Sequence, residues 1–150
     1  MSSLDILKNL PYTKPFLFVE NLTSVTEDRA EGMYTFKKDE FFYKGHFKDN
    51  PVTPGVILVE CMAQIGLVCL GIFLLKDNIE EKQNEHLQIA LSSHQVDFYK
   101  PVFPKEKVTV ISEKVYFRFN KLKCNVTMLN ENGELVAKGN ISGMLKMRNN

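Results

Sequence analysis

The sequence predicts an α+β domain in which an antiparallel sheet wraps around one long apolar helix. Residues 56–75 form a run of 20 mostly apolar residues, which is long enough for a helix of several turns. Segments rich in Val, Ile, Phe and Thr, which are typical of strands, stand on both sides of this run, two before it and four after it. Since nothing else could cover every face of a single apolar helix, the sheet must surround it.

The two segments before the helix predict strands over Phe16–Thr26 and Ala30–Lys38, joined by the polar turn Glu27–Arg29. An irregular stretch rich in aromatic residues, Gly and Pro follows over Asp39–Pro54. These features predict a hairpin followed by a long loop.

The helix is expected to begin at Thr53-Pro54-Gly55 and to run to about Lys76. Thr53 is a good N-cap residue, and proline is favoured in the first turn, where its missing N–H costs nothing. Asp77–Glu85 is polar and predicts a connection. Glu60 and Gln64 lie inside the apolar run, and an ionisable group is expensive at membrane depth. We therefore expect a buried core helix and no membrane span.

The remaining sequence predicts four strands connected by tight turns. Asn130–Gly133 is typical of a hairpin turn, and Asn120-Lys121 predicts another. The expected strands cover Leu87–Phe98, Lys107–Phe119, Leu122–Asn130 and Leu135–Met147.

Composition indicates a soluble protein forming a single domain over residues 1–150. With 44% hydrophobic and 25% charged residues the chain is ordinary, and a net charge of +1 gives no strong field for nucleic acid or membranes. Gln95–Asn150 holds ten Lys or Arg against five Asp or Glu. This excess is either a solvated surface or a match for an acidic partner.

Cysteine usage favours a reducing compartment. Cys61, Cys69 and Cys124 are an odd number without a CxxC pair, so they predict neither a disulfide framework nor a zinc site. Met1–Leu10 has no basic start followed by an apolar run, so we expect no secretory signal and a cytoplasmic location.

Three residues around the expected helix start suit proton removal next to a carbonyl. His46, in a Gly/Pro loop, can take a proton near neutral pH. The free N–H groups at the helix start, especially that of Gly55, can hold a carbonyl oxygen as it gains negative charge. Glu60, in apolar surroundings, can hold a proton and donate it.

Each residue also has a purely structural interpretation. His46 alone is more often a hydrogen-bonded loop residue, and Gln64, one turn after Glu60, is either its hydrogen-bonding partner or an independent polar group. A purely structural role is less plausible for Glu60. Burying an uncharged polar group without a partner already costs about 2–7 kcal/mol, and burying an unpaired carboxylate costs more.

The sequence resembles the bacterial 3-hydroxyacyl-[acyl-carrier-protein] dehydratases of the broad-specificity, non-isomerising type. The resemblance covers nearly the whole chain. It is carried by five segments: Leu10-Pro11 with Pro15–Glu20, Gly45-His46-Phe47 with Pro51–Val56, Glu60–Gln64, Val96–Val102 and Gly133–Ala137.

The resemblance implies a hot-dog fold and a homodimer whose sheets join edge to edge, with three dimers often forming a hexamer. It implies that His46 of one subunit faces Glu60 of the other, and that these two residues are catalytic. The Gly55 amide would polarise the thioester carbonyl. We assign Gly55, Val56, Gln64 and Phe98 to substrate binding.

The resemblance also implies that neither a metal nor an organic cofactor is needed. The substrate would arrive on the phosphopantetheine arm of an acidic acyl carrier protein, within fatty acid synthesis or a related lipid or polyene pathway.

Three positions depart from the family pattern. Tyr12-Thr13 replaces a His-Arg pair, Lys48 replaces a proline, and Pro104-Lys105-Glu106 replaces a Pro-Gly-Asp turn. The residues of the proposed chemistry are intact, so we expect these changes to affect the substrate entrance and the carrier-facing surface.

Two other functions stay open from the sequence. A hot-dog acyl thioesterase would share the fold and hydrolyse the thioester. A non-catalytic acyl-binding subunit would explain the departures, although a buried glutamate without a role would be costly.

Overall fold

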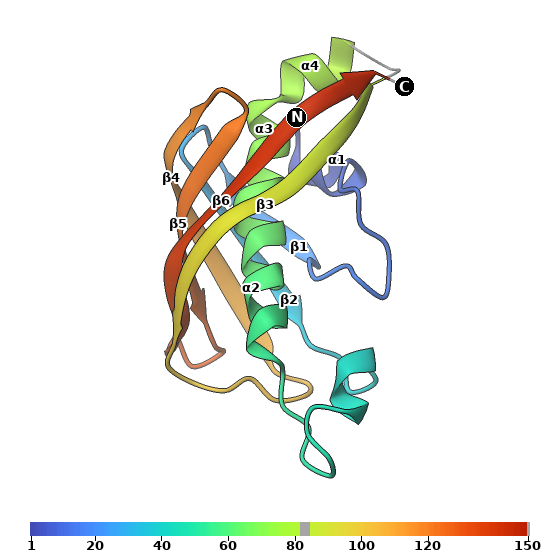
Figure 1. Ribbon diagram of the computed structural model, residues 1–150, viewed down its shortest axis with the longest axis vertical. Helices are drawn as coiled ribbons and strands as arrows, with labels where there is room; N and C mark the ends of the chain where they lie inside the picture. Colours follow the sequence, from blue (N-terminus) through green and yellow to red (C-terminus); the bar gives the residue numbers. More distant parts are fainter. Residues whose placement is uncertain (82–84, 150) are drawn as a thin grey trace.

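In the part of the chain that the structure describes, six strands form one antiparallel sheet that curls around a central helix, which is the hot-dog fold (Figure 1). The structure is a computed structural model and describes residues 1–81 and 85–149. The strand order is β1-β2-β4-β5-β6-β3, so β1 and β3 are the two edges. The strands are β1 Asn21–Val25, β2 Arg29–Thr35, β3 Glu85–Phe98, β4 Lys107–Arg118, β5 Lys121–Leu129 and β6 Leu135–Asn149.

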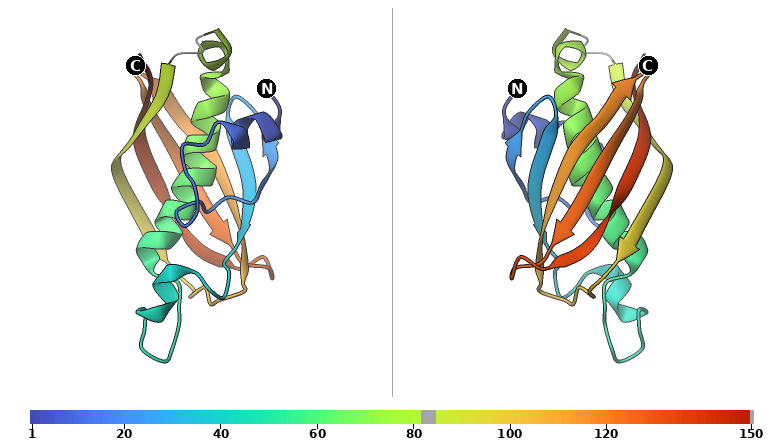
Figure 2. Two further views of the ribbon diagram at one scale, coloured as in Figure 1. Left: turned by 90° about the vertical axis from the view of Figure 1, so that its right-hand side faces the viewer. Right: turned by 90° about the vertical axis from the view of Figure 1, so that its left-hand side faces the viewer.

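The central helix crosses the concave side of this sheet along most of its length (Figure 2). It consists of α2 Gly55–Ala63, the π-helical turn η2 Gln64–Val68 and α3 Cys69–Leu74. The helix is long and apolar enough to cross a bilayer, but 83% of its most apolar window is buried inside the protein. The prediction of a buried core helix is therefore confirmed. Cys61 and Cys69 of this helix and Cys124 of β5 are free and buried.

The π-helical turn is anchored to the sheet through a buried hydrogen bond. The Ser112 hydroxyl of β4 donates to the Gly66 carbonyl over 2.8 Å. A Cβ on Gly66 would lie 3.0 Å from the Ser112 side chain and 3.1 Å from that of Val126. The sheet therefore approaches the helix closely at this level.

The first predicted strand is shorter than expected. Residues 16–20 lie outside β1, and the Gln64 side chain binds the backbone of Phe16 and Phe18. Because a helix side chain satisfies these backbone groups, the segment lies along the helix without a neighbouring strand on that side. The second strand also ends early, at Thr35.

The helix begins at Gly55, but the predicted cap is wrong. Pro54 occupies the N-cap position, and no side chain caps the helix. The Thr53 hydroxyl instead bonds the Tyr43 hydroxyl over 2.7 Å. Both hydroxyls are buried, so each would otherwise lack a partner.

Two short helices were not predicted. Helix α1, Ser3–Lys8, begins with a capping box in which Ser2 and Asp5 bond each other's backbone N–H. Helix α4, Lys76–Glu81, occupies most of the expected connection before β3. Residues 82–84 of this connection lie outside the described part of the chain. A 3-10 turn, η1 Phe41–Lys44, precedes the His46 loop.

The hairpin turns follow the prediction with one shift. Gly133 has a φ of 77° and its N–H bonds the Asn130 carbonyl, so β5 and β6 are joined as expected. The β4–β5 turn is centred on Phe119-Asn120, one residue before the predicted position, and both residues have positive φ. This geometry is that of a type I′ turn, which suits Asn but is unusual for Phe.

Candidate active site

The His46 side chain is held by its own loop. Its Nδ1 lies 2.9 Å from the Val52 carbonyl oxygen, and the Val52 N–H donates to the His46 carbonyl, also over 2.9 Å. Because a carbonyl can only accept, a neutral His46 carries its proton on Nδ1. The other ring nitrogen, Nε2, is then free to accept a proton.

A hollow of about 320 Å³ lies beside this histidine at the start of the central helix. Gly55 is the first helical residue, so its N–H has no acceptor within the helix. A Cβ at this position would lie 3.3 Å from the Phe98 ring, so the ring closes directly over Gly55. The hollow is lined by His46, Val52, Thr53, Gly55, Leu58, Phe98, Tyr99, Lys100 and Pro101.

Glu60 is half-buried and hydrogen-bonded to Gln64. The Gln64 Nε2 donates to Glu60 Oε1 over 3.0 Å and to the Phe16 carbonyl over 3.1 Å. The Gln64 Oε1 accepts from the Phe18 N–H over 2.8 Å. Since Gln64 is fully buried, these contacts fix both its own orientation and that of Glu60.

Tyr12 is a further residue near Glu60, and the sequence did not connect the two. Burial raises the pKa of the Tyr12 hydroxyl well above its usual range, and the charge of Glu60 raises it further. Tyr12 therefore remains neutral. It is one of the departures from the family pattern, and no signal in the sequence points to its position beside Glu60.

His46 and Glu60 lie on different sides of the central helix within one chain. Gly55 faces the His46 hollow, and five residues later Glu60 is rotated from it by about 140° around the helix axis. Among the described residues, the lining of that hollow does not include Glu60. Val56, one turn before Glu60 on the same flank, is 76% exposed. The Glu60 carboxylate thus lies beside Gln64 and the Phe16 segment, and not in the hollow that its own His46 lines.

The other predicted substrate-binding residues divide between these two places. Phe98 lines the His46 hollow, whereas Val56 and Gln64 lie on the Glu60 flank. In the part of the chain that the structure describes, no group of three or more His, Cys, Asp or Glu side chains could hold a metal ion. The expectation that no cofactor is needed stays a prediction.

Comparison with a family model places residues 10–141 in the FabA-like domain family. A 3-hydroxyacyl-[acyl-carrier-protein] dehydratase FabZ of Caldicellulosiruptor bescii is 33% identical over 148 residues, which covers 97% of this chain and 100% of the relative. A FabZ of Ehrlichia ruminantium is 38% identical over 107 residues, covering 71% of this chain and 70% of its own.

Solved structures share the fold at low sequence identity. A chain of the dehydratase heterocomplex ApeI:P from Xenorhabdus doucetiae matches with a TM-score of 0.77 and 13% identity, covering 94% of this chain and 90% of its own. A hypothetical thioesterase with coenzyme A from Streptococcus pneumoniae matches with a TM-score of 0.58 and 14% identity, covering 86% of this chain and 87% of its own.

Proposed function

The chain belongs to the FabA-like domain family, and from this premise we propose that it is a 3-hydroxyacyl-[acyl-carrier-protein] dehydratase. The reaction removes water from a 3-hydroxyacyl thioester and yields the trans-2-enoyl thioester. One observation carries the proposal. His46 is hydrogen-bonded through Nδ1 and lines the same hollow as Gly55, whose N–H has no acceptor within the helix.

The proposed mechanism assigns one step to each group. His46 Nε2 removes a proton from the carbon beside the thioester carbonyl. The Gly55 N–H binds the carbonyl oxygen as negative charge develops on it. Protonated Glu60 gives its proton to the departing 3-hydroxyl, which leaves as water, and the double bond forms between the two carbons. The proton on His46 then returns to Glu60 through solvent.

A complete site requires two subunits, because His46 and Glu60 point to different sides of one chain. The edge strand β3 offers a surface for the second copy, since the side chains from Ala90 to Gln95 are exposed. Nearby Val56, Leu91 and Phe98 are exposed apolar residues at 76%, 48% and 49%. Edge-to-edge pairing of two β3 strands would cover this region and bring Glu60 to the partner's His46. Association of such dimers into a hexamer is part of the same proposal.

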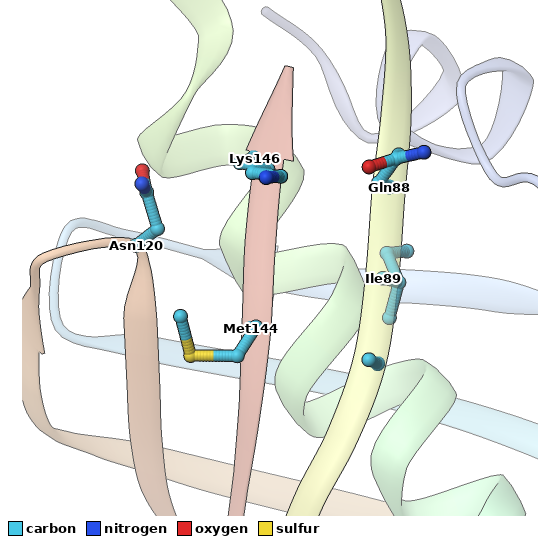
Figure 3. Close-up of a pocket in the computed structure, with 6 residues that line it drawn as sticks. Gln88, Ile89, Asn120, Met144 and Lys146 are labelled. Atoms are coloured by element: carbon cyan, nitrogen blue, oxygen red, sulfur yellow. The ribbon is translucent and has the colours of Figure 1, made fainter. Parts of the chain in front are cut away.

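The β4–β5 hairpin is the proposed docking surface for the carrier protein. Residues 114–130 contain no Asp or Glu, and the outer face of the hairpin presents Arg118, Lys121 and Lys123. Lys146 of β6 extends this face beside Asn120 and Met144, around a hollow of about 480 Å³ (Figure 3).

The charges of this hairpin face are available to a partner. Among the ion pairs of the described residues, none includes Arg118, Lys121, Lys123 or Lys146. Arg118 and Lys121 stand opposite each other in the ladder, although like charges at opposite positions are unfavourable. An acidic carrier protein would relieve this repulsion, and its phosphopantetheine arm would deliver the acyl group.

The proposed substrate also indicates a cellular location and a pathway. We propose a cytoplasmic enzyme of fatty acid synthesis or of a related lipid or polyene pathway that uses no cofactor of its own.

Hydration of a trans-2-enoyl thioester on carrier protein tests the function, because the reverse reaction removes enoyl absorbance. We expect reversible hydration by the wild type and a loss of about a hundredfold or more in His46→Ala and in Glu60→Gln. Glu113→Gln is a matched control, since Glu113 is exposed on β4.

Absence of hydration with both short and long acyl chains would reject the dehydratase. Release of free thiol would then indicate a thioesterase, and tight acyl binding without turnover would indicate a non-catalytic subunit.

A further inference from the structure

A second hollow lies on the other side of the catalytic loop from His46. Its volume is about 730 Å³, and it opens between the segment around η1 and the β3–β4 loop. Both segments lie at the lower end of the molecule in Figure 1. The lining is Lys38, Asp39, Glu40, Tyr43, Lys44, Pro51, Pro104 and Lys105. A hollow of this size suits a small ligand.

Three of the lining residues are lysines with exposed side chains, Lys38, Lys44 and Lys105. Lys38 and Lys44 belong to the segment around η1 and Lys105 to the β3–β4 loop, so the fold brings the two segments together. Among the ion pairs of the described residues, none includes any of the three. Their ammonium groups are therefore available to a bound anion.

Lys105 holds its place in the turn at a conformational cost. It has a φ of 75°, and the Glu106 N–H closes the turn on the Phe103 carbonyl over 3.2 Å. A four-residue turn with Pro104 second and positive φ at the third position is typical of a type II turn, which favours Gly there. A lysine in the left-handed region is uncommon and points to a role for its side chain.

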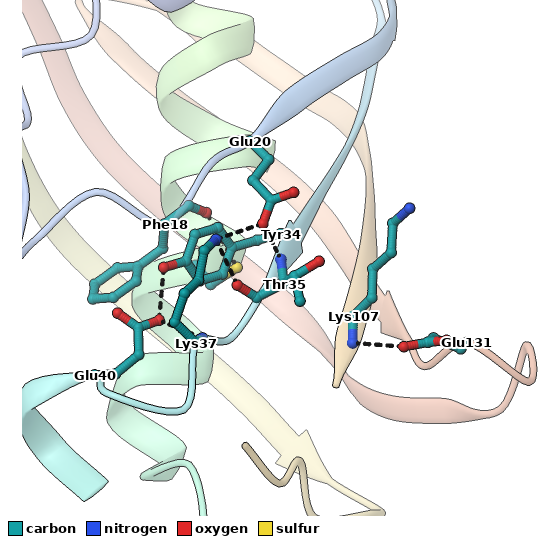
Figure 4. A network of polar contacts seen from close by, with 9 residues as sticks. Phe18, Glu20, Tyr34, Thr35, Lys37, Glu40, Lys107 and Glu131 are labelled. Atoms are coloured by element: carbon teal, nitrogen blue, oxygen red, sulfur yellow. Dashed lines mark hydrogen bonds and ion pairs between the residues drawn. The ribbon is translucent and has the colours of Figure 1, made fainter. Parts of the chain in front are cut away.

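The two carboxylates of the lining do not neutralise these lysines by contact. Glu40 Oε2 accepts from the Tyr34 hydroxyl over 2.6 Å and from the Lys37 N–H over 3.3 Å (Figure 4). Asp39 and Glu40 also border a separate hollow of about 310 Å³, where Lys14 and Lys37 stand. The three lysines thus remain the cationic groups of the larger hollow.

We propose that this hollow binds a phosphoryl group of a small ligand, with Lys38, Lys44 and Lys105 as its cationic partners. Three ammonium groups on two facing segments can surround a tetrahedral anion and donate charge-assisted hydrogen bonds to several of its oxygens. Pro51, Pro104 and the Tyr43 ring give the hollow apolar walls. The phosphoryl group belongs either to the carrier of the acyl thioester or to a free phosphorylated metabolite.

The site is connected to the catalytic loop by short contacts. Tyr43, in its wall, bonds Thr53 across the Pro51–Thr53 segment, and Thr53 lines the His46 hollow. Pro51 precedes Val52, whose carbonyl accepts from His46. A ligand in the outer hollow therefore contacts the segment that holds the proposed base in place.

Binding is tested by titrating the protein with inorganic pyrophosphate and 4′-phosphopantetheine while recording backbone amide NMR spectra. We expect saturable shifts confined to residues 38–44, 51–53 and 103–106. Lys38→Ala, Lys44→Ala and Lys105→Gly should each weaken binding by about tenfold. Lys8→Ala removes an exposed charge on α1, at the opposite end of the molecule, and should leave the affinity unchanged.

Lys105→Gly separates ligand binding from folding. Glycine suits a φ of 75°, so this variant should keep or raise the melting temperature while it loses affinity for the phosphoryl ligand. Equal affinity in Lys105→Gly and wild type would overturn the proposal. So would non-saturating shifts spread over lysines throughout the chain.

A kinetic comparison identifies the source of the phosphoryl group and rests on the proposed dehydratase function. If the group belongs to the substrate, Lys105→Gly should raise KM about tenfold for an enoyl-phosphopantetheine thioester and leave KM unchanged for the enoyl-pantetheine thioester. If KM is unchanged for both while pyrophosphate binding is lost, the ligand is a free metabolite. If the wild type binds pyrophosphate but hydrates neither thioester, the dehydratase function is rejected and the phosphoryl site is retained.

Discussion

Gln64 makes more hydrogen bonds than any other described side chain of the candidate site. Its amide joins Glu60 to the backbone of Phe16 and Phe18, and it is completely buried. A glutamine is needed because one end must donate twice and the other must accept. The same residue thus orients a proposed catalytic group and fastens the N-terminal segment to the helix.

Gln64→Met should lower the free energy of unfolding by about 2–4 kcal/mol. Methionine fills a similar volume but leaves the Phe18 N–H and the Phe16 carbonyl without their partner. Urea unfolding at pH 7 measures the change. Gln95→Met is the matched control, since Gln95 is exposed on β3 and its replacement should stay within about 0.5 kcal/mol. Equal stabilities of the two variants would show that the buried contacts contribute little.

The proposed chemistry of His46, Gly55 and Glu60 stays a prediction, whereas part of the local structure around these residues could be predicted from the sequence. A helix start after a Gly/Pro loop was readable because residue types determine it locally. The Gln64–Glu60 contact was also predictable from their four-residue spacing. The proximity of Tyr12 to Glu60 was not, since it depends on how a segment without regular structure packs against the helix.

At the scale of elements, the edge strand β3 is held against β6 by an unusually close approach. A Cβ on Gly139 would lie 1.9 Å from the Gln95 carbonyl oxygen and 2.7 Å from the Val96 Cα. Both atoms belong to the β3 backbone, which cannot move without breaking its ladder to β6. Only glycine therefore fits at this position of β6.

Gly139→Ala should cost about 2 kcal/mol or more in stability, because β3 must shift away from β6. Thermal unfolding followed by circular dichroism measures the loss. Gly45→Ala serves as the stability control, because a Cβ at Gly45 meets nothing within 4 Å. If Gly139→Ala melts at the wild-type temperature, the close approach of the two strands is not maintained in solution.

The strands after the helix matched the prediction closely, whereas the N-terminal elements did not. Long alternating segments such as β4 and β5 carry a clear period-2 pattern of burial. Residues 16–20 have the composition of a strand, yet the helix side chain Gln64 takes the backbone groups that a neighbouring strand would use. Such tertiary competition for hydrogen bonds leaves no trace in local sequence.

At the scale of the whole molecule, buried thiols and phenols predict a steep loss of stability in alkali. Burial raises the pKa of Cys124 from 9.0 to about 12 and that of Tyr43 from 10.0 to about 12. Burial also raises the pKa values of Cys61, Cys69, Tyr12 and Tyr34. In the unfolded chain these groups lose their protons near pH 9–10, whereas the folded chain retains them.

These thiols and phenols should therefore leave stability unchanged between about pH 6 and 8 and make it fall between about pH 9 and 12. Each such group loses its proton at a lower pH in the unfolded chain than in the folded chain. Between these two pKa values it lowers the free energy of unfolding by about 1.4 kcal/mol per pH unit. Urea midpoints at pH 7, 9, 10 and 11 measure the fall. Cys124→Ala should fall less steeply than the wild type, since one titrating group is removed. Parallel curves for the two proteins would contradict a buried, neutral Cys124.

The arrangement of His46 and Glu60 predicts that two inactive variants can restore each other. In a mixed dimer of His46→Ala and Glu60→Gln, one of the two sites combines an intact His46 from one subunit with an intact Glu60 from the other. Random exchange makes about half of the dimers mixed, each with one working site of two, so hydration should recover to about a quarter of the wild-type rate.

The measurement requires mixing the two variants under conditions that let subunits exchange, then assaying hydration of the enoyl thioester. Each variant treated alone in the same way is the control and should stay inactive. Recovery would place each site between two subunits, as we propose from the absence of Glu60 from the described lining of the His46 hollow and from the exposed β3 edge. A mixture as inactive as its components, with exchange verified by mass spectrometry, would instead mean that each chain closes around its own substrate. His46 and Glu60 would then have to approach each other across the central helix, and the exposed Val56 flank would need another partner.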